Sequence, residues 1–172
     1  PLYIAAQQDQ IEAVRYLVEN GADINQCRND GWTPLYIASL KGHDEIVKCL
    51  LEYIADVNKA TESGFTPVIV AAQLGHTDII KYLVNNGANV NQGCNEGATP
   101  LYIAAQQGQI EAVKCLVKNG ADINQCRNNG WTPLHIATQP GHTNIIKHLV
   151  NKGASVNQGC NEGSTPLYIA AQ

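Results

Sequence analysis

The sequence predicts an all-α repeat solenoid, in which stacked helix-turn-helix units are joined by β-hairpin-like turns. Its 172 residues carry prolines at a constant spacing of 33 residues. A period of this length is typical of a stack in which each unit contacts only its neighbours. With 44% apolar and 15% charged residues, the chain can bury a continuous core, so neither a disordered tail nor a coiled coil is expected. The periodic prolines are Pro1, Pro34, Pro67, Pro100, Pro133 and Pro166.

Each period is expected to open with a short, buried helix. A threonine precedes the proline, which supplies an N-cap hydroxyl followed by proline at the first helical position. An alanine such as Ala38 follows the proline by one helical turn, where a larger side chain would keep neighbouring helices apart. A glycine such as Gly42 then ends the helix. The capping threonines are Thr33, Thr66, Thr99, Thr132 and Thr165.

A second helix is expected to follow, with one apolar face. Ile46, Val47, Leu50 and Leu51 are spaced as on one side of an amphipathic helix. We predict that Asp44, Thr77 and Thr143 are N-caps of such helices.

A polar turn completes the period. A glycine ends the second helix in a left-handed conformation at Gly21, Gly87, Gly120 and Gly153, and a polar segment runs on to a second glycine such as Gly31. The period is therefore turn, helix, turn, helix, and no single period can bury its own apolar face.

We expect one repeat domain over residues 1–172, with periods 1–33, 34–66, 67–99, 100–132 and 133–165 and a partial repeat at 166–172. The chain begins and ends with PLYIAAQ, which predicts a piece of a longer array, cut within a repeat at both ends. Neither end shows a polar capping repeat, and bare stacking faces favour end-to-end self-association or fraying. Residues 1–43 match residues 100–142 at 34 of 43 positions, which indicates segmental duplication.

The phrases GWTPLYIASLKGHDEIVKCLL (Gly31 to Leu51) and GWTPLHIATQPGHTNIIKHLV (Gly130 to Val150) resemble ankyrin repeats over the entire chain. A 33-residue period with T-P-L-x-x-A in register is a specific signature of that family. The resemblance implies L-shaped units whose turn tips and first helices line a concave surface that binds partner proteins.

Two departures from the family pattern concern stability. The family's usual histidine after T-P-L is present only at His135, so a histidine-centred hydrogen-bond pattern is not carried over to the other periods. Ile54 lies where other periods have glycine, and a left-handed β-branched residue would cost about 1 to 2 kcal/mol. We therefore expect the second helix of that period to end differently.

Composition argues against several functional classes. The net charge is −4 without a basic stripe, so no nucleic-acid partner is expected. No apolar run approaches the roughly 18 residues that span a bilayer, so no membrane insertion is expected. Six cysteines without a Cys-x-x-Cys spacing favour a reducing compartment, the cytoplasm with the nucleus as the alternative. No catalytic motif, cofactor loop or metal-binding pattern is present, and we predict a non-enzyme without cofactor.

Three aromatic residues are candidate partner contacts. Trp32, Phe65 and Trp131 share the position just before the Thr-Pro cap, where Ala98 and Ser164 occur in other periods. A position that accepts such different residues is expected to lie outside the core, and exposed tryptophan often dominates interface energetics. The alternative is that the rings fold back on a neighbouring turn.

Charged and apolar residues nearby extend this candidate surface. Arg28 and Arg127, at the tips of the QCRN turns, can pair with carboxylates of a partner, although solvated turn residues are the simpler interpretation. Leu40 and Leu74, near the ends of first helices, are expected to be exposed and to add apolar area.

Asparagines and cysteines recur in the turns. One asparagine per period is expected to stabilise the turn backbone. Similar asparagines in ankyrin repeats are hydroxylated by a cellular oxygenase, so the resemblance implies modification as a secondary hypothesis. Cys94, Cys126 and Cys160 are expected to form a row along the turn edge, as free thiols. The asparagines are Asn25, Asn58, Asn91, Asn124 and Asn157.

The leading hypothesis is a non-catalytic scaffold that binds a protein partner, whose identity the sequence does not give, through its turns and first helices. Two alternatives are a substrate-recruiting array within a larger enzyme, such as a kinase or ubiquitin ligase, and a purely structural spacer.

Overall fold

The computed structural model of the chain describes residues 1–171. These residues form two compact units: unit 1 is Pro1–Ala71 with His76–Asn89, and unit 2 is Ala72–Gly75 with the chain from Val90 onward. No strand occurs within residues 1–171, which confirms the all-helical fold class. The helices are α1 (Leu2–Gln7), α2 (Ile11–Glu19), α3 (Pro34–Lys41), α4 (Asp44–Glu52), α5 (Pro67–Leu74), α6 (Thr77–Asn85), α7 (Pro100–Gln106), α8 (Ile110–Lys118), α9 (Pro133–Thr138), α10 (Thr143–Asn151) and α11 (Pro166–Ala170).

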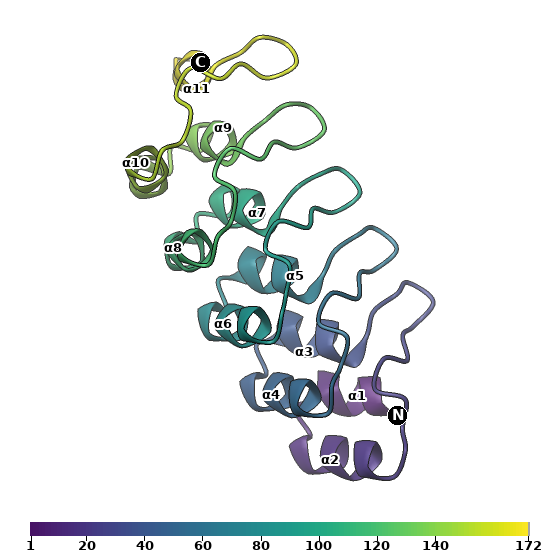
Figure 1. The fold of residues 1–172 in the computed structure, drawn as a ribbon. Helices are drawn as coiled ribbons and strands as arrows, with labels where there is room; N and C mark the ends of the chain where they lie inside the picture. Colours follow the sequence, from purple (N-terminus) through teal and green to yellow (C-terminus); the bar gives the residue numbers. More distant parts are fainter. Residues whose placement is uncertain (172) are drawn as a thin grey trace. The chain divides into compact units, whose positions relative to one another are not determined.

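Within each unit, the helices form two rows (Figure 1). In unit 1, α1 packs beside α3, while α2, α4 and α6 pack in succession. In unit 2, α7, α9 and α11 form the first row, and α8 packs beside α10. The two helices of one period also pack together, as α3 does with α4. This is the stacked arrangement that a short period predicts.

Most residues of the first helices α3 and α7 are buried. Thr33 caps α3, because its Oγ1 accepts a hydrogen bond from the backbone amide of Tyr36 at 3.1 Å. Thr99, Thr132 and Thr165 cap their helices in the same way, with proline in the first turn. Ala38 is completely buried, as is its equivalent Ala104. The predicted caps and close helix contacts are therefore confirmed.

The second helices bury one face and leave the other to solvent. In α4, Ile46 and Leu50 are fully buried. On the exposed face, Lys48 pairs with Glu45, with an Nζ–Oε1 distance of 2.6 Å. The apolar stripe read from the sequence is thus the face that packs inward.

The predicted caps of the second helices were wrong by one residue. The N-caps of α4, α6 and α10 are His43, His76 and His142, and Asp44, Thr77 and Thr143 are the first helical residues. No side-chain hydrogen bond caps these helices. The ring of His43 instead lies with Nε2 3.2 Å from the carbonyl oxygen of Gln7, near the end of α1. The cap position is therefore used to connect one period with the preceding one.

Hairpin-like turns project from the helix rows (Figure 1). In the first, the amide of Arg28 donates to the carbonyl of Trp32 at 3.1 Å, and the amide of Gly31 donates to the carbonyl of Arg28 at 2.9 Å. The same pair of bonds recurs at Thr61, Cys94, Arg127 and Cys160. We number these turns 1 (residues 24–32), 2 (57–65), 3 (90–98), 4 (123–131) and 5 (156–164).

Neighbouring turns approach closely, and glycine permits the approach. In unit 2, the amide of Asn128 in turn 4 donates to the carbonyl of Glu96 in turn 3 at 3.0 Å. Gly97 has φ of 80°, and a Cβ there would lie 2.5 Å from Oδ1 of Asn128. Any side chain at this position would push the two turns apart.

Ile54 ends α4 in the left-handed conformation, with φ of 63°. Its amide donates to the carbonyl of Leu51 at 3.0 Å, as the amide of Gly87 does to Val84 after α6. The expectation of a different helix end was therefore wrong. The isoleucine side chain is 85% exposed, so little packing offsets its backbone strain.

Candidate functional site

Arg28 of turn 1 lies beside a cluster of three aromatic rings from α1, turn 1 and α3. The guanidinium carbon of Arg28 lies 5.4 Å from the ring centroid of Tyr3 and 5.9 Å from that of Trp32. Nη1 of Arg28 donates to the hydroxyl of Tyr3 at 3.3 Å. The ring of Tyr36 lies 4.9 Å from Trp32, between centroids. We call Tyr3, Arg28, Trp32 and Tyr36 the aromatic cluster of turn 1.

The charge of Arg28 is partly balanced inside the cluster. Its Nη2 lies 3.5 Å from Oδ2 of Asp30, and the side chains of Arg28 and Asp30 are 55% and 40% exposed. The hydrogen bond to Tyr3, followed by the charge of Asp30, raises the pKa of Arg28. Burial raises the pKa of Tyr36. The cluster thus presents a permanent cation beside neutral aromatic rings, a combination common at protein interfaces.

Turn 4 repeats the arginine and the tryptophan with different partners. Arg127 forms an ion pair with Glu96 of turn 3 and is half-buried. The rings of Trp131 and His135 lie 6.0 Å apart, between centroids. Identical residues therefore have different roles, because Arg127 joins two turns whereas Arg28 contacts residues of its own period.

His135 connects its helix to the following turn. Its Nδ1 accepts a hydrogen bond from the amide of Thr132 at 3.2 Å, so the proton resides on Nε2, which donates to the carbonyl of Ser164 at 3.1 Å. The ring is fully buried, and burial lowers its pKa. A histidine-centred hydrogen-bond pattern is thus present at this single T-P-L-H phrase of the sequence.

The aromatic position before the cap is less exposed than expected. Trp32, Phe65 and Trp131 are all half-buried, and Ala98 is buried. The expectation that this position lies outside the core was wrong for Ala98. The three aromatic residues lie at the edge of the core, because the side chain packs on the helix that it precedes, as Trp32 does on Tyr36. Part of each large ring still contacts solvent.

The two leucines that were predicted to be exposed differ in their solvent exposure. Leu74, at the end of α5, is exposed. Leu40 is half-buried, so the prediction was wrong for this residue. The physical reason is the position of α3, which packs against both α1 and α4.

The turn asparagines bridge successive periods. Oδ1 of Asn91 accepts a hydrogen bond from the amide of Asp122 at 2.8 Å, and its Nδ2 donates to the carbonyl of Gly120 at 3.2 Å. We call this pair of bonds the asparagine clamp. Asn58 and Asn124 make both of these bonds to the next period, and Oδ1 of Asn25 accepts from Asp56 at 2.8 Å. Sequence reasoning assigned the asparagines to their own turns and missed these contacts, although their recurrence in every period was a signal.

A family model described as ankyrin repeats (3 copies) matches the chain at residues 1–61, 54–127 and 120–172, which together span its length. The chain belongs to the ankyrin repeat family. Ankyrin repeats generally act as protein–protein interaction modules and are typically non-catalytic. A comparison with curated proteins gave no match. In the part of the chain that the structure describes, no helix is long and apolar enough to span a membrane.

The three cysteines predicted to form a row along the turn edge of these ankyrin repeats are free thiols that differ in exposure. Cys94 and Cys160 are buried, whereas Cys126 is exposed. Cys126 lies one residue earlier in its turn than the other two do, and this shift places its side chain on the solvent side. Among the described residues, no group of three histidine, cysteine or acidic side chains could hold a metal ion.

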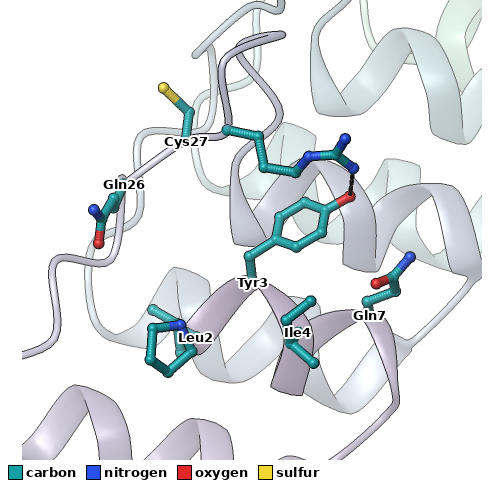
Figure 2. Close-up of a pocket in the computed structure, with 8 residues that line it drawn as sticks. Leu2, Tyr3, Ile4, Gln7, Gln26 and Cys27 are labelled. Carbon is teal, nitrogen blue, oxygen red and sulfur yellow. Dashed lines mark hydrogen bonds between the residues drawn. The ribbon is translucent and has the colours of Figure 1, made fainter.

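The first ankyrin repeat carries a pocket of about 350 Å³ between α1 and turn 1. Figure 2 shows Ile4 and Gln7 of α1 on one side of Tyr3, and Gln26 and Cys27 of turn 1 on the other. The dashed line marks the hydrogen bond between Arg28 and Tyr3. The aromatic cluster of turn 1 therefore borders an open depression.

Proposed function

We propose that this chain is a non-catalytic scaffold that binds a partner protein through its turns and first helices. The observation that carries the proposal is the aromatic cluster of turn 1, in which a half-buried tryptophan lies beside an accessible arginine. Tryptophan, tyrosine and arginine are the residue types that contribute most to interface energetics. We also place the protein in a reducing compartment, most simply the cytoplasm, on the basis of its cysteine spacing.

The candidate contacts differ in what they can offer a partner. Arg28 can exchange its exposed pairing with Asp30 for a carboxylate of the partner. Arg127 is committed to Glu96, which makes it the weaker anchor. Trp32, Phe65 and Trp131 supply ring surface, and Leu74 and the partly accessible Leu40 supply aliphatic surface.

Affinity capture from cell lysate with the purified chain tests this proposal. The double variant Trp32→Ala, Trp131→Ala is expected to lose most of the captured partner, since truncating an interface anchor typically costs about 2 kcal/mol or more. The fold should tolerate the change, because alanine occupies the same position at Ala98. Captured proteins are identified by mass spectrometry, and helicity is checked by circular dichroism.

Tyr16→Ala is the matched control, because Tyr16 is an exposed aromatic residue on the second helix row. It should retain the partner. Equal capture by the parent and the double variant would remove the tryptophans from the site. Capture of no protein by either chain would favour the spacer alternative.

We propose hydroxylation of the turn asparagines as a secondary property. Four of them engage the following period through their side chains, whereas Asn157 is exposed. A mass increase of one oxygen atom on peptides from protein purified from eukaryotic cells is expected, first on the peptide with Asn157. Unmodified peptides at all five positions would refute it. The five positions are Asn25, Asn58, Asn91, Asn124 and Asn157.

A further inference from the structure

Helix α4 ends with residues that differ from those at the ends of the other second helices. An Asn-Gly pair follows α2, α6 and α8, at residues 20–21, 86–87 and 119–120. Tyr53 and Ile54 take these two places after α4. Within unit 1, α4 packs against both α2 and α6 (Figure 1). The surface that α4 leaves open therefore does not arise from a missing neighbour.

The asparagine and the glycine each stabilise a helix end, and α4 has neither. Nδ2 of Asn86 donates to the carbonyl of Tyr82 at 2.8 Å, which adds a hydrogen bond to one of the last carbonyls of α6. Glycine adopts the left-handed conformation without strain, whereas Ile54 adopts it at φ of 63° with a β-branched side chain. Strained residues of this kind cluster at functional sites.

The side chain of Ile54 projects into solvent and is 85% exposed. The same position is open in other periods, because a Cβ on Gly87 or Gly120 would meet nothing within 4 Å. The exposure is thus a property of this position in the repeat. A large aliphatic side chain gains little packing within the chain there, but it offers apolar surface to a partner.

A pocket of about 300 Å³ lies between α4 and α6, next to this helix end. Its lining residues are Lys48, Leu51, Glu52, Tyr82 and Asn86. Nζ of Lys48 lies 4.7 Å from the ring centroid of Tyr82 and pairs with Glu45, so this cation already has partners. Ligand pockets start at about 300 Å³, so the volume suits one side chain of a partner better than a cofactor.

The surface around this pocket is acidic. Glu19 of α2 and Glu52 are exposed, and neither makes an ion pair within residues 1–171. Oε1 of Glu19 accepts a hydrogen bond from the hydroxyl of Tyr53 at 3.0 Å, which brings this carboxylate to the end of α4. The surface therefore complements a cation. In α2 and α4 together, the acidic residues are Glu12, Glu19, Asp44, Glu45 and Glu52, and the basic residues are Arg15 and Lys48.

We propose that the end of α4 and the pocket beside it bind a segment of a partner protein in which an arginine stands next to an aliphatic residue. The arginine pairs with Glu52 and lies over the ring of Tyr53. The aliphatic side chain contacts Ile54 and enters the pocket over Leu51. Arginine fits better than lysine, because its planar guanidinium can pair with a carboxylate through two hydrogen bonds and stack on an aromatic ring. This surface belongs to the second helices and is separate from the turns and first helices.

Selection from a random peptide library displayed on phage tests the proposal, with the purified chain immobilised. A parallel selection uses the double variant Glu52→Lys, Ile54→Gly, and the peptides that only the parent chain retains are kept. We expect these peptides to share an arginine beside leucine, isoleucine or valine. Synthetic copies are then titrated against each single variant. Glu52→Lys should raise the dissociation constant by about tenfold, because repulsion replaces attraction. Ile54→Gly should raise it by about threefold to tenfold, because apolar contact is lost.

Both variants should remain folded. Lys118 occupies the position of Glu52 in the fourth period, and glycine occupies that of Ile54 in the other periods. Ile54→Gly also relieves backbone strain, so weaker binding by this variant does not result from unfolding. Glu162→Lys is the matched control, because it makes the same change in charge at an exposed residue of turn 5. It should leave the dissociation constant unchanged.

A library without any peptide that distinguishes the parent from the double variant would overturn the proposal. Selected peptides that lack a basic residue, or unchanged affinity in either single variant, would overturn it as well. The double variant Trp32→Ala, Trp131→Ala leaves the end of α4 intact and should bind the selected peptides like the parent. Loss of the peptides in that variant would place them on the turns and contradict the proposal, so the two surfaces are tested independently.

Discussion

Arg28 and Arg127 show that surroundings decide what a residue does in this chain. Both follow the same Gln-Cys dipeptide and precede a tryptophan in their turn. Arg127 is held by Glu96 of the preceding turn, whereas Arg28 lies over Tyr3 and beside Asp30. An arginine whose ion-pair partner is accessible to water can be recruited by a ligand at lower cost than one that joins two turns. This difference makes Arg28 the stronger candidate for partner binding.

Ile54 carries the clearest single-residue strain. Ile54→Gly should raise the free energy of unfolding by about 1 kcal/mol, since relief of about 1 to 2 kcal/mol of left-handed strain is partly offset by the greater freedom of glycine in the unfolded chain. Urea unfolding measures the change. Ile54→Ala, which keeps a Cβ at the same φ of 63°, is the control and should gain less. A glycine variant no more stable than the alanine variant would contradict the assignment of strain.

At the scale of elements, helix starts and core positions were predictable because their causes are local. A Thr-Pro pair supplies both an N-cap and a fixed φ, and a periodic alanine permits close packing whatever lies further along the chain. The caps of the second helices were not predictable in this way. His43 occupies the cap because its ring reaches Gln7 of the preceding period, a contact that the spacing within one helix does not reveal.

The candidate site was predictable in residue type but not in geometry. Tryptophan before the cap was recognised from the variation at its position, yet its half-buried state arises from a contact with Tyr36 on the next helix. The asparagine clamps escaped prediction because each joins residues about one period apart, as Asn91 does with Asp122. The sequence pattern predicted features within a period but not the contacts between periods.

At the scale of the whole molecule, the buried His135 and the half-buried His148 make stability depend on pH. His135 is fully buried, and within the described residues Nε2 of His148 is buried without a hydrogen-bond partner. Burial lowers the pKa of both, and for His148 the charges of Lys152 and Lys114 lower it further. Both residues lie in the period 133–165, so we expect this period to lose stability first as the pH falls.

The sign of the effect follows from proton uptake. Because the folded-state pKa of each histidine lies below its unfolded value of about 6.5, the unfolded chain binds protons first as the pH falls. This contribution to stability is complete above about pH 6.5 and is lost as the pH falls from there through the folded-state pKa values. The urea midpoint should therefore decrease between about pH 7.5 and pH 5.5. Protonation of Nδ1 would also abolish its acceptor role toward Thr132.

A double variant that uses residues already present in the chain isolates this contribution. His135→Tyr introduces the residue found at Tyr36 and Tyr102, and His148→Tyr introduces the one found at Tyr82. The variant should remain folded, and its urea midpoint should fall less than that of the parent over the same pH interval. An equally steep decrease in both proteins would assign the acid sensitivity to other groups. The exposed carboxylates are the next candidates, since lysine partners lower the pKa of Glu45 and Asp78 and place their titration below the histidine range.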